Sequence, residues 1–189
     1  DLFGLPARYR VIEEEAKKHN LFVLEDAAQG FGGAIRGRKA GSFGHVAATS
    51  FFPAKPLGCY GDGGAVFTND DELADNIRSI RIHGSSSDKY DNTRVGINGR
   101  LDTIQAAILL EKLAIFDDEI GFRNKVAEYY SSNINQSIKT PHIPDGYLSS
   151  WAQYSVILPD NLERHFVMEQ LKSKEIPTIV YYQTPLHLQ

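Results

Sequence analysis

The sequence predicts an α/β protein whose first strand belongs to a parallel sheet. Short apolar runs of strand length alternate with longer segments of helical pattern. The clearest run, 21–24 (LFVL), is wholly apolar, as expected of a strand buried on both faces. A helical segment leads directly into it, which is typical of the crossovers that join parallel strands. Further strands are expected within 45–52 and at 64–68.

Two helices are expected in the first half of the chain. The segment 6–18 has a proline near its first turn and basic residues in its last turn, where they complement the helix dipole. The segment 69–81 has Asn69 or Asp70 as its cap and acidic residues in its first turn. Both patterns indicate well-delimited helices.

The second half begins with the longest helical pattern, 101–120, and a further helix over 122–133 is expected after Gly121. Residues 134–150 are rich in Pro, Gly, Ser and Asn, which is typical of a connection between lobes. The elements expected after this connection are a strand at 154–158, a helix from Asp160 with Glu163 at capping-box spacing, and a strand at 178–182.

Composition and charge exclude several function classes. Twenty Lys and Arg against 24 Asp and Glu give a net charge of −4, whereas nucleic-acid binders usually carry a basic surplus. No run approaches the roughly 18 apolar residues of a membrane span. Cys59 is the only cysteine, which excludes an intrachain disulfide and fits a reducing cytoplasm. Histidine and cysteine spacing shows no zinc pattern, so no metal is expected.

The sequence starts at Asp1 and not at a methionine. Its first expected helix leads into a strand, but no strand precedes that helix, so the crossover unit lacks its first strand. We therefore expect an interior portion of a longer protein, lacking the N-terminal part of its sheet.

Two segments are candidates for chemistry. Asp26 follows the 21–24 run, at the strand end where open α/β sheets bind ligands; the alternative is a helix cap for the segment that starts at Ala27. Lys55 lies among apolar residues and prolines in the turn after the second expected strand. Desolvation favours the neutral amine that a Schiff base requires. A glycine-rich turn with an exposed lysine is the alternative.

Weaker signals lie between the second and third expected helices. Asn98 and Arg100, just ahead of a helix N-terminus, suit a phosphate or carboxylate, or Asn98 simply caps that helix. His83 ends a helix beside Gly84, where complementing the helix dipole is its commoner role.

The motif Asp26-Ala-Ala-Gln29, followed by Ser50, Lys55 and Gly-Asp-Gly-Gly at 61–64, resembles the signature of the DegT/StrS-type sugar aminotransferases. The resemblance covers all 189 residues. It implies the aspartate-aminotransferase fold (fold type I) of pyridoxal-phosphate (PLP) enzymes.

The resemblance also implies a domain division. Residues 1–121 would form the C-terminal half of the large, cofactor-binding domain. Residues 122–189 would form a linking helix and part of the small C-terminal α/β domain.

The resemblance assigns cofactor-binding roles. Lys55 would hold PLP as a Schiff base and then move the proton during transamination. Asp26 would keep the pyridine nitrogen protonated. Gln29 would lie against the ring, Ser50 would donate to the phosphate, and Asn98 would reach the phosphate from the neighbouring subunit of a dimer.

Substrate-side roles follow from the same resemblance for His83, Arg100, Tyr181 and Tyr182. In the branch of the family that this sequence most resembles, histidine often stands where this chain has Tyr181. The identity of the sugar substrate is therefore left open.

The segment 49–65 most resembles the branch of this family that aminates the 3-keto group of UDP-N-acetyl-3-keto-glucuronic acid. The implied enzyme is a cytoplasmic homodimer that transfers an amino group from glutamate, for surface polysaccharide or lipopolysaccharide synthesis. The alternatives are amination at position 4, a dehydratase offshoot in which histidine replaces the lysine, and a non-catalytic relative that binds PLP or a sugar nucleotide. Lys55 argues against the dehydratase.

Overall fold

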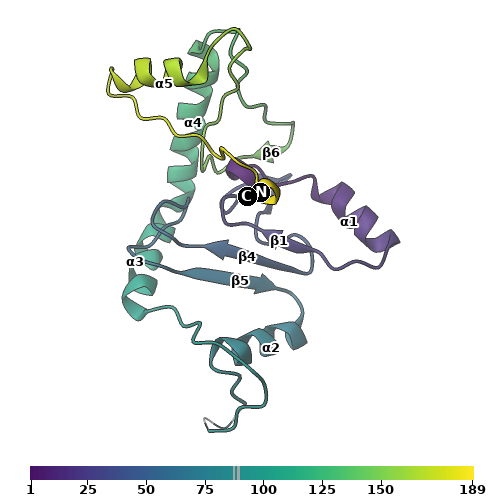
Figure 1. The fold of residues 1–189 in the computed structure, drawn as a ribbon. Coiled ribbons are helices and arrows are strands. Elements are labelled where there is room, and N and C mark those ends of the chain that lie inside the picture. The colour runs from purple at the N-terminus through teal and green to yellow at the C-terminus, as the bar shows by residue number, and fades with distance from the viewer. Residues whose placement is uncertain (87, 89) are drawn as a thin grey trace. The chain divides into compact units, whose positions relative to one another are not determined.

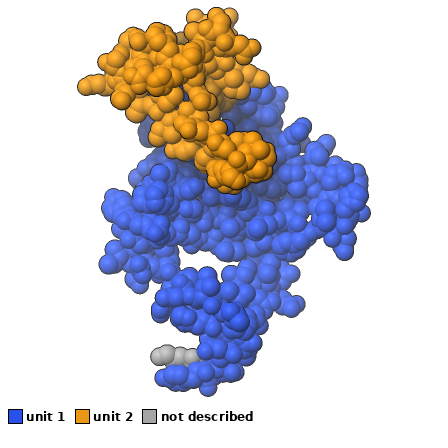
Figure 2. Space-filling model, viewed as in Figure 1, with its two compact units in different colours: residues 1–132, 142–154 blue, residues 133–141, 155–189 orange. Residues whose placement is uncertain are grey.

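The structure is a computed structural model that describes residues 1–86, 88 and 90–189. It divides into two compact units, coloured separately in Figure 2. Unit 1 comprises residues 1–132 and 142–154, and unit 2 comprises residues 133–141 and 155–189. The division at residues 121 and 122 that the resemblance implies stays a prediction.

Unit 1 is built on two small sheets. The main sheet has the order β1-β4-β5, with β4 parallel to β1 and antiparallel to β5 (Figure 1). An antiparallel sheet that the sequence did not indicate has the order β3-β2-β6. The strands are β1 (Leu24–Asp26), β2 (Ala34–Ile35), β3 (Arg38–Lys39), β4 (Val46–Ser50), β5 (Gly64–Thr68) and β6 (Tyr147–Leu148).

Five α-helices accompany the strands in the described part of the chain. They are α1 (Tyr9–Lys18), α2 (Asp71–Arg81), α3 (Thr103–Ala114), α4 (Phe116–Asn133) and α5 (Arg164–Lys172). Short 3-10 turns lie at Leu2–Gly4 and Leu186–Leu188. Asp70 caps α2, as expected, by accepting a hydrogen bond from the amide of Leu73 at 2.9 Å.

The first strand is displaced from its expected position. The ladder with β4 starts at Leu24 and runs to Asp26, so the 21–24 run mostly precedes the strand. Its side chains are not buried on both faces: Val23 is buried, whereas Leu24 is 66% exposed. Alternation along an extended backbone places successive side chains on opposite faces, and in the described chain one face has no cover.

The long helical pattern breaks earlier than expected. Ile115 ends α3 with a non-helical backbone, and α4 starts at the next residue. Three acidic residues, 117–119, occupy the first turn of α4, where the helix dipole favours them. Gly121 lies inside α4, so the predicted break there is wrong.

The strands expected at 154–158 and 178–182 are not formed. The former segment contributes one isolated bridge, between Lys139 and Ile157, and no neighbouring strand extends it. Without a ladder of partners, an apolar run does not become a strand.

The unit 2 helix α5 begins at Arg164, four residues beyond Asp160. Glu163 is itself the N-cap, because its carboxylate accepts hydrogen bonds from the amides of His165 (2.9 Å) and Phe166 (2.6 Å). These two donations hold the pKa of Glu163 below its ordinary value. The expected helix is confirmed, but its capping-box start is wrong.

The core of unit 1 joins the turn between β4 and β5 to helices α3 and α4. Phe31 packs against it and stacks on Phe116 and Phe67, with ring centroids 5.8 Å apart in both pairs. The core residues are Phe51, Leu57, Cys59, Leu109, Phe116 and Ile120. This packing fixes the turn that carries Lys55 against two helices.

Glu25 is a buried carboxylate on β1, with 1% of its surface exposed. Its two oxygens accept hydrogen bonds from the amides of Gly41 (2.6 Å) and Phe43 (2.7 Å). Burial raises the pKa of Glu25, although the two amides and Arg38 oppose the shift. The carboxylate therefore fixes the turn that leads into β4.

We expect Glu25→Ala to lower the free energy of unfolding by about 2–5 kcal/mol, because two buried amides lose their acceptor. Denaturant unfolding of the protein measures this. Glu14→Ala, which removes an exposed carboxylate from α1, should change it by less than about 0.5 kcal/mol. Equal effects of the two variants would show that the buried hydrogen bonds contribute little.

None of the described helices is long and apolar enough to cross a bilayer. Within the same described residues, no group of three or more His, Cys, Asp or Glu side chains is arranged to hold a metal ion.

Candidate functional site

Asp26 is the last residue of β1, not a residue beyond the strand. Its register partner on β4 is Ala48, two residues before Ser50. Its Oδ1 accepts a hydrogen bond from the amide of Ala28 at 3.0 Å, and the side chain is otherwise exposed. Because β1 and β4 are parallel, Asp26 and Ser50 lie at the same edge of the sheet.

Lys55 lies in the turn that joins β4 to β5. Its amide donates to the carbonyl of Phe52 at 2.8 Å, and the residue is half-buried. Nζ has no hydrogen-bond or ion-pair partner among the described residues. The backbone is close-packed here, since a Cβ on Gly58 would lie 2.5 Å from the carbonyl oxygen of Pro53. The amine is thus held on a compact turn and is free to react.

Ser50 and Gln29 complete the group at this edge. The Ser50 Oγ accepts from the amide of Phe52 at 3.2 Å, which leaves its hydroxyl proton free to donate. The Gln29 Oε1 accepts from the amide of Phe3 at 2.6 Å, which leaves its amide group as a donor. Of the predicted cofactor residues, Asp26 and Ser50 thus end two neighbouring strands, and Gln29 and Lys55 follow those strands within five residues.

The other predicted residues of unit 1, His83, Asn98 and Arg100, follow α2 in the chain. His83 has a positive φ of 60° and donates its amide to the carbonyl of Ile97 at 2.9 Å. Asn98 accepts from Nε of Arg100 at 2.9 Å. In the described structure no hydrogen bond joins these three residues to Asp26 or Lys55.

Tyr181 and Tyr182 belong to unit 2. Their rings meet edge to face, with centroids 5.5 Å apart. Their predicted place on the substrate side stays a prediction.

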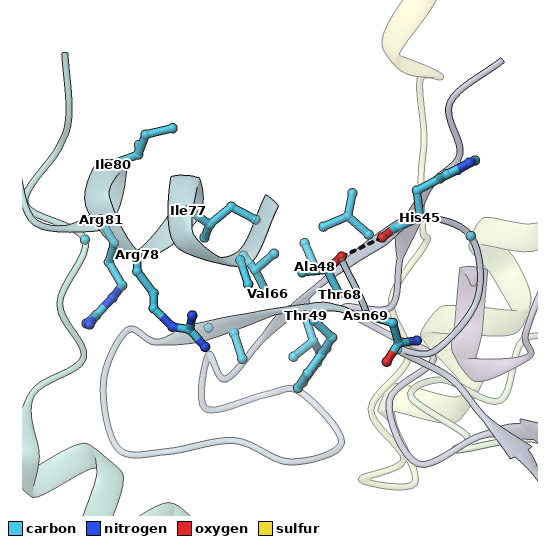
Figure 3. A pocket seen from close by; sticks show the side chains of 18 of the residues that line it. His45, Ala48, Thr49, Val66, Thr68, Asn69, Ile77, Arg78, Ile80 and Arg81 are labelled. Atoms are coloured by element: carbon cyan, nitrogen blue, oxygen red, sulfur yellow. Dashed lines mark hydrogen bonds between the residues drawn. The ribbon is translucent and has the colours of Figure 1, made fainter. Parts of the chain in front are cut away.

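A groove of about 850 Å³ lies elsewhere on unit 1, between strands β4 and β5 and helix α2. Figure 3 shows Val66 of β5 and Ile77 of α2 lining it, with Arg78 and Arg81 also on the helix side. Its lining includes none of Asp26, Gln29, Ser50 or Lys55. We place the candidate site at the strand ends, because the reactive side chains lie there.

Sequence reasoning missed two side chains of α3 that hold the Lys55 turn. Lys112 Nζ donates to the carbonyl of Gly58 at 2.5 Å, and Gln105 Oε1 accepts from the amide of Tyr60 at 2.8 Å. Neither residue belongs to a motif, because each binds backbone about 50 residues away in the chain. No sequence signal was available to find them.

An amine on the turn after β4, together with a carboxylate and a hydroxyl at the ends of two parallel strands, is a set of groups suited to PLP chemistry. The chain belongs to the DegT/DnrJ/EryC1/StrS aminotransferase family, whose model matches residues 1–189. This family is PLP-dependent and its members have fold type I, which confirms the expected fold class.

Individual relatives agree with this family assignment. The chain is 50% identical, over its whole length, to the UDP-2-acetamido-2-deoxy-3-oxo-D-glucuronate aminotransferase of Pseudomonas aeruginosa, of which it covers 52%. A DegT/DnrJ/EryC1/StrS aminotransferase from Brucella abortus superposes with a TM-score of 0.96 at 53% identity, over 100% of this chain and 50% of that one. NtdA from Bacillus subtilis, solved with bound cofactor PMP, superposes with a TM-score of 0.87 at 26% identity, over 100% and 43%. The chain thus spans about half the length of the relatives it matches.

The residues present fit the family's cofactor. The unpaired Lys55 amine suits the cofactor's aldehyde, the Asp26 carboxylate suits a protonated ring nitrogen, and the free hydroxyl proton of Ser50 suits a phosphate oxygen. Gln29 retains a donor beside them. Each group has unused hydrogen-bonding or reactive capacity that matches its assigned partner.

Proposed function

We propose that the full-length protein, meaning this chain with any residues that accompany it in the cell, is a PLP-dependent aminotransferase. It transfers an amino group from glutamate to the keto group of a nucleotide-linked sugar, leaving 2-oxoglutarate and an amino sugar. The observation that carries the proposal is that Asp26 and Ser50 are the last residues of the parallel strands β1 and β4, and that Lys55 lies in the turn directly after β4.

Each residue has a separate task in this reaction. When bound, the cofactor supplies an electron sink that makes the proton next to nitrogen acidic. Lys55 anchors the cofactor and moves that proton with its amine. Asp26 holds a proton on the ring nitrogen, while Ser50 and Gln29 orient the phosphate and the ring.

For the substrate we propose a UDP-N-acetyl-3-keto-hexuronic acid, used for surface polysaccharide such as lipopolysaccharide. The name of the Pseudomonas aeruginosa relative supports this class. His83, Arg100, Tyr181 and Tyr182 are the proposed substrate-side residues. A guanidinium such as that of Arg100 suits the sugar carboxylate or a phosphate.

The test is a two-stage assay of the full-length protein. Glutamate alone should convert the visible absorbance of the PLP form to that of the amine form, and added UDP-3-keto sugar acid should reverse it. Mass spectrometry should then detect the 3-amino sugar. A 4-amino product from a 4-keto substrate instead would change the position assigned, and no conversion by glutamate would contradict the proposal.

We infer that two copies share their sites, with Asn98 of one reaching the cofactor phosphate of the other. Past α2 the chain continues in a loop (Figure 1), whose described residues include exposed apolar side chains, with Val95 95% and Ile97 63% exposed. Asn98 is exposed and bonded only to Arg100 in the described structure. Exposed aliphatic side chains that gather on one surface are typical of a surface that meets a partner, and the Asn98 Nδ2 is left to donate to it. A reducing cytoplasm fits the single, unpaired Cys59.

Mixing subunits tests the shared site. Lys55→Ala and Asn98→Ala dimers should each be inactive, whereas random exchange between them should restore about one quarter of wild-type activity, because half the dimers are mixed and each has one intact site. Turnover after denaturing and refolding the mixture measures this. A mixture as inactive as its parents would contradict sharing.

A further inference from the structure

Arg123 of α4 contacts two separate backbone segments, one of which is the Lys55 turn. Its Nη2 donates to the carbonyl of Pro56 at 3.2 Å, and its Nη1 donates to the carbonyl of Ser150 at 3.4 Å. The residue is half-buried, and no carboxylate of the described chain lies within 4.0 Å of it. Its partners are therefore two backbone carbonyls from segments distant in sequence.

The second of these segments leads to Gln29. Ser150 is fully buried, and its Oγ donates to the carbonyl of Gln29 at 2.6 Å. Its amide donates to the carbonyl of Gly4 at 2.9 Å. Asn124, next to Arg123, adds a bond from Nδ2 to the carbonyl of Ser149 at 3.1 Å. The segment 149–150 is thus fixed to α4 on one side and to the Gln29 segment on the other.

We propose that Arg123 is a positioning residue that sets the Lys55 turn and the Gln29 segment at a fixed spacing. It acts through Pro56 on the first and through Ser150 on the second. This inference rests on the proposed function, because it concerns the residues that hold the cofactor. Arg123 itself touches none of the reacting atoms.

The chemistry of the guanidinium suits this task. It is a planar fork of donors that stays charged at all working pH values, so it holds two acceptors at a defined separation. Lysine offers a point charge and reaches one of two separated carbonyls. Lys112 and Gln105 already hold the far end of the turn, at Gly58 and Tyr60, so Arg123 fixes the end nearest Lys55.

The first test uses the full-length protein without cofactor and measures amide hydrogen exchange. Arg123→Gln should speed exchange about tenfold in peptides covering 52–62 and 26–31, because it loses the charged hydrogen bonds to Pro56 in the first segment and to Ser150, which holds Gln29 in the second. Lys125→Gln, an exposed change on the same helix, is the matched control and should leave both peptides unchanged. Unchanged exchange in either peptide of the Arg123 variant overturns the proposal.

Arg123→Lys guards against a variant that fails to fold. It should keep the overall fold and speed exchange by about threefold in one of the two peptides, because a single donor group remains. Unchanged exchange in both peptides would overturn the proposal in this variant as well.

A second test adds PLP and measures steady-state kinetics. Arg123→Gln should lower kcat about tenfold with little change in the glutamate KM, and Arg123→Lys should restore part of kcat. A rise in KM alone would overturn the positioning role. Failure of wild-type protein to bind PLP would contradict the proposed function instead, and the exchange result without cofactor would remain interpretable.

Discussion

Lys55→Ala is expected to abolish turnover of the full-length protein and to remove the visible absorbance of its lysine-linked cofactor. The loss of proton transfer alone costs about 10²–10⁴-fold in rate, and the loss of the covalent anchor adds to it. Because Lys55 has no hydrogen-bond or ion-pair partner for Nζ among the described residues, the variant should fold normally. Steady-state turnover and an absorbance spectrum measure the two effects.

The control for this variant is Lys17→Ala, which removes an exposed lysine from α1. It should keep both the turnover and the spectrum of the wild type. If Lys55→Ala also kept its turnover, Lys55 would be a residue of a glycine-rich turn and nothing more.

Asp26→Asn is expected to lower kcat by about 10²–10³-fold, the usual cost of removing one preorganised electrostatic group. A neutral amide cannot balance the charge of a protonated ring nitrogen. The substitution is informative because asparagine keeps the Oδ1 acceptor that receives the Ala28 amide, so the local cap survives. Turnover and thermal unfolding of the same preparation measure activity and fold together.

The two interpretations of Asp26 give opposite results. If it holds the ring proton, activity falls while the free energy of unfolding changes by less than about 0.5 kcal/mol. If Asp26 serves only as a cap, Asp26→Asn should resemble the wild type in both measurements.

The elements that sequence predicted well are those whose signals are local. Strand β5 starts and ends where expected, at Gly64 and Thr68, and Asp70 caps α2. Strand β1 was displaced because an apolar run identifies extended chain but not where its ladder begins. The break at Ile115 was missed because it is made by backbone conformation and carries no glycine or proline, whereas Gly121 only resembled a break.

The residues of the candidate site also divide into those with a local sequence signal, which were predicted, and those without one, which were not. Asp26, Gln29, Ser50 and Lys55 lie in recognisable motifs at strand ends, and sheet topology then brings them to one edge. The side chains that hold the turn are Gln105, Lys112 and Arg123, and they were not predicted. They bind backbone carbonyl and amide groups, which every residue carries, so no residue type marks the partner in the sequence.

The most direct test of the central claim is to load the full-length protein with PLP, reduce it with borohydride, and map the labelled peptide by mass spectrometry. A single phosphopyridoxyl label on Lys55 is the predicted result, and Lys55→Ala should remove it. A label confined to other lysines, or no label after saturation with PLP, would contradict the assignment of Lys55 as the cofactor-binding residue.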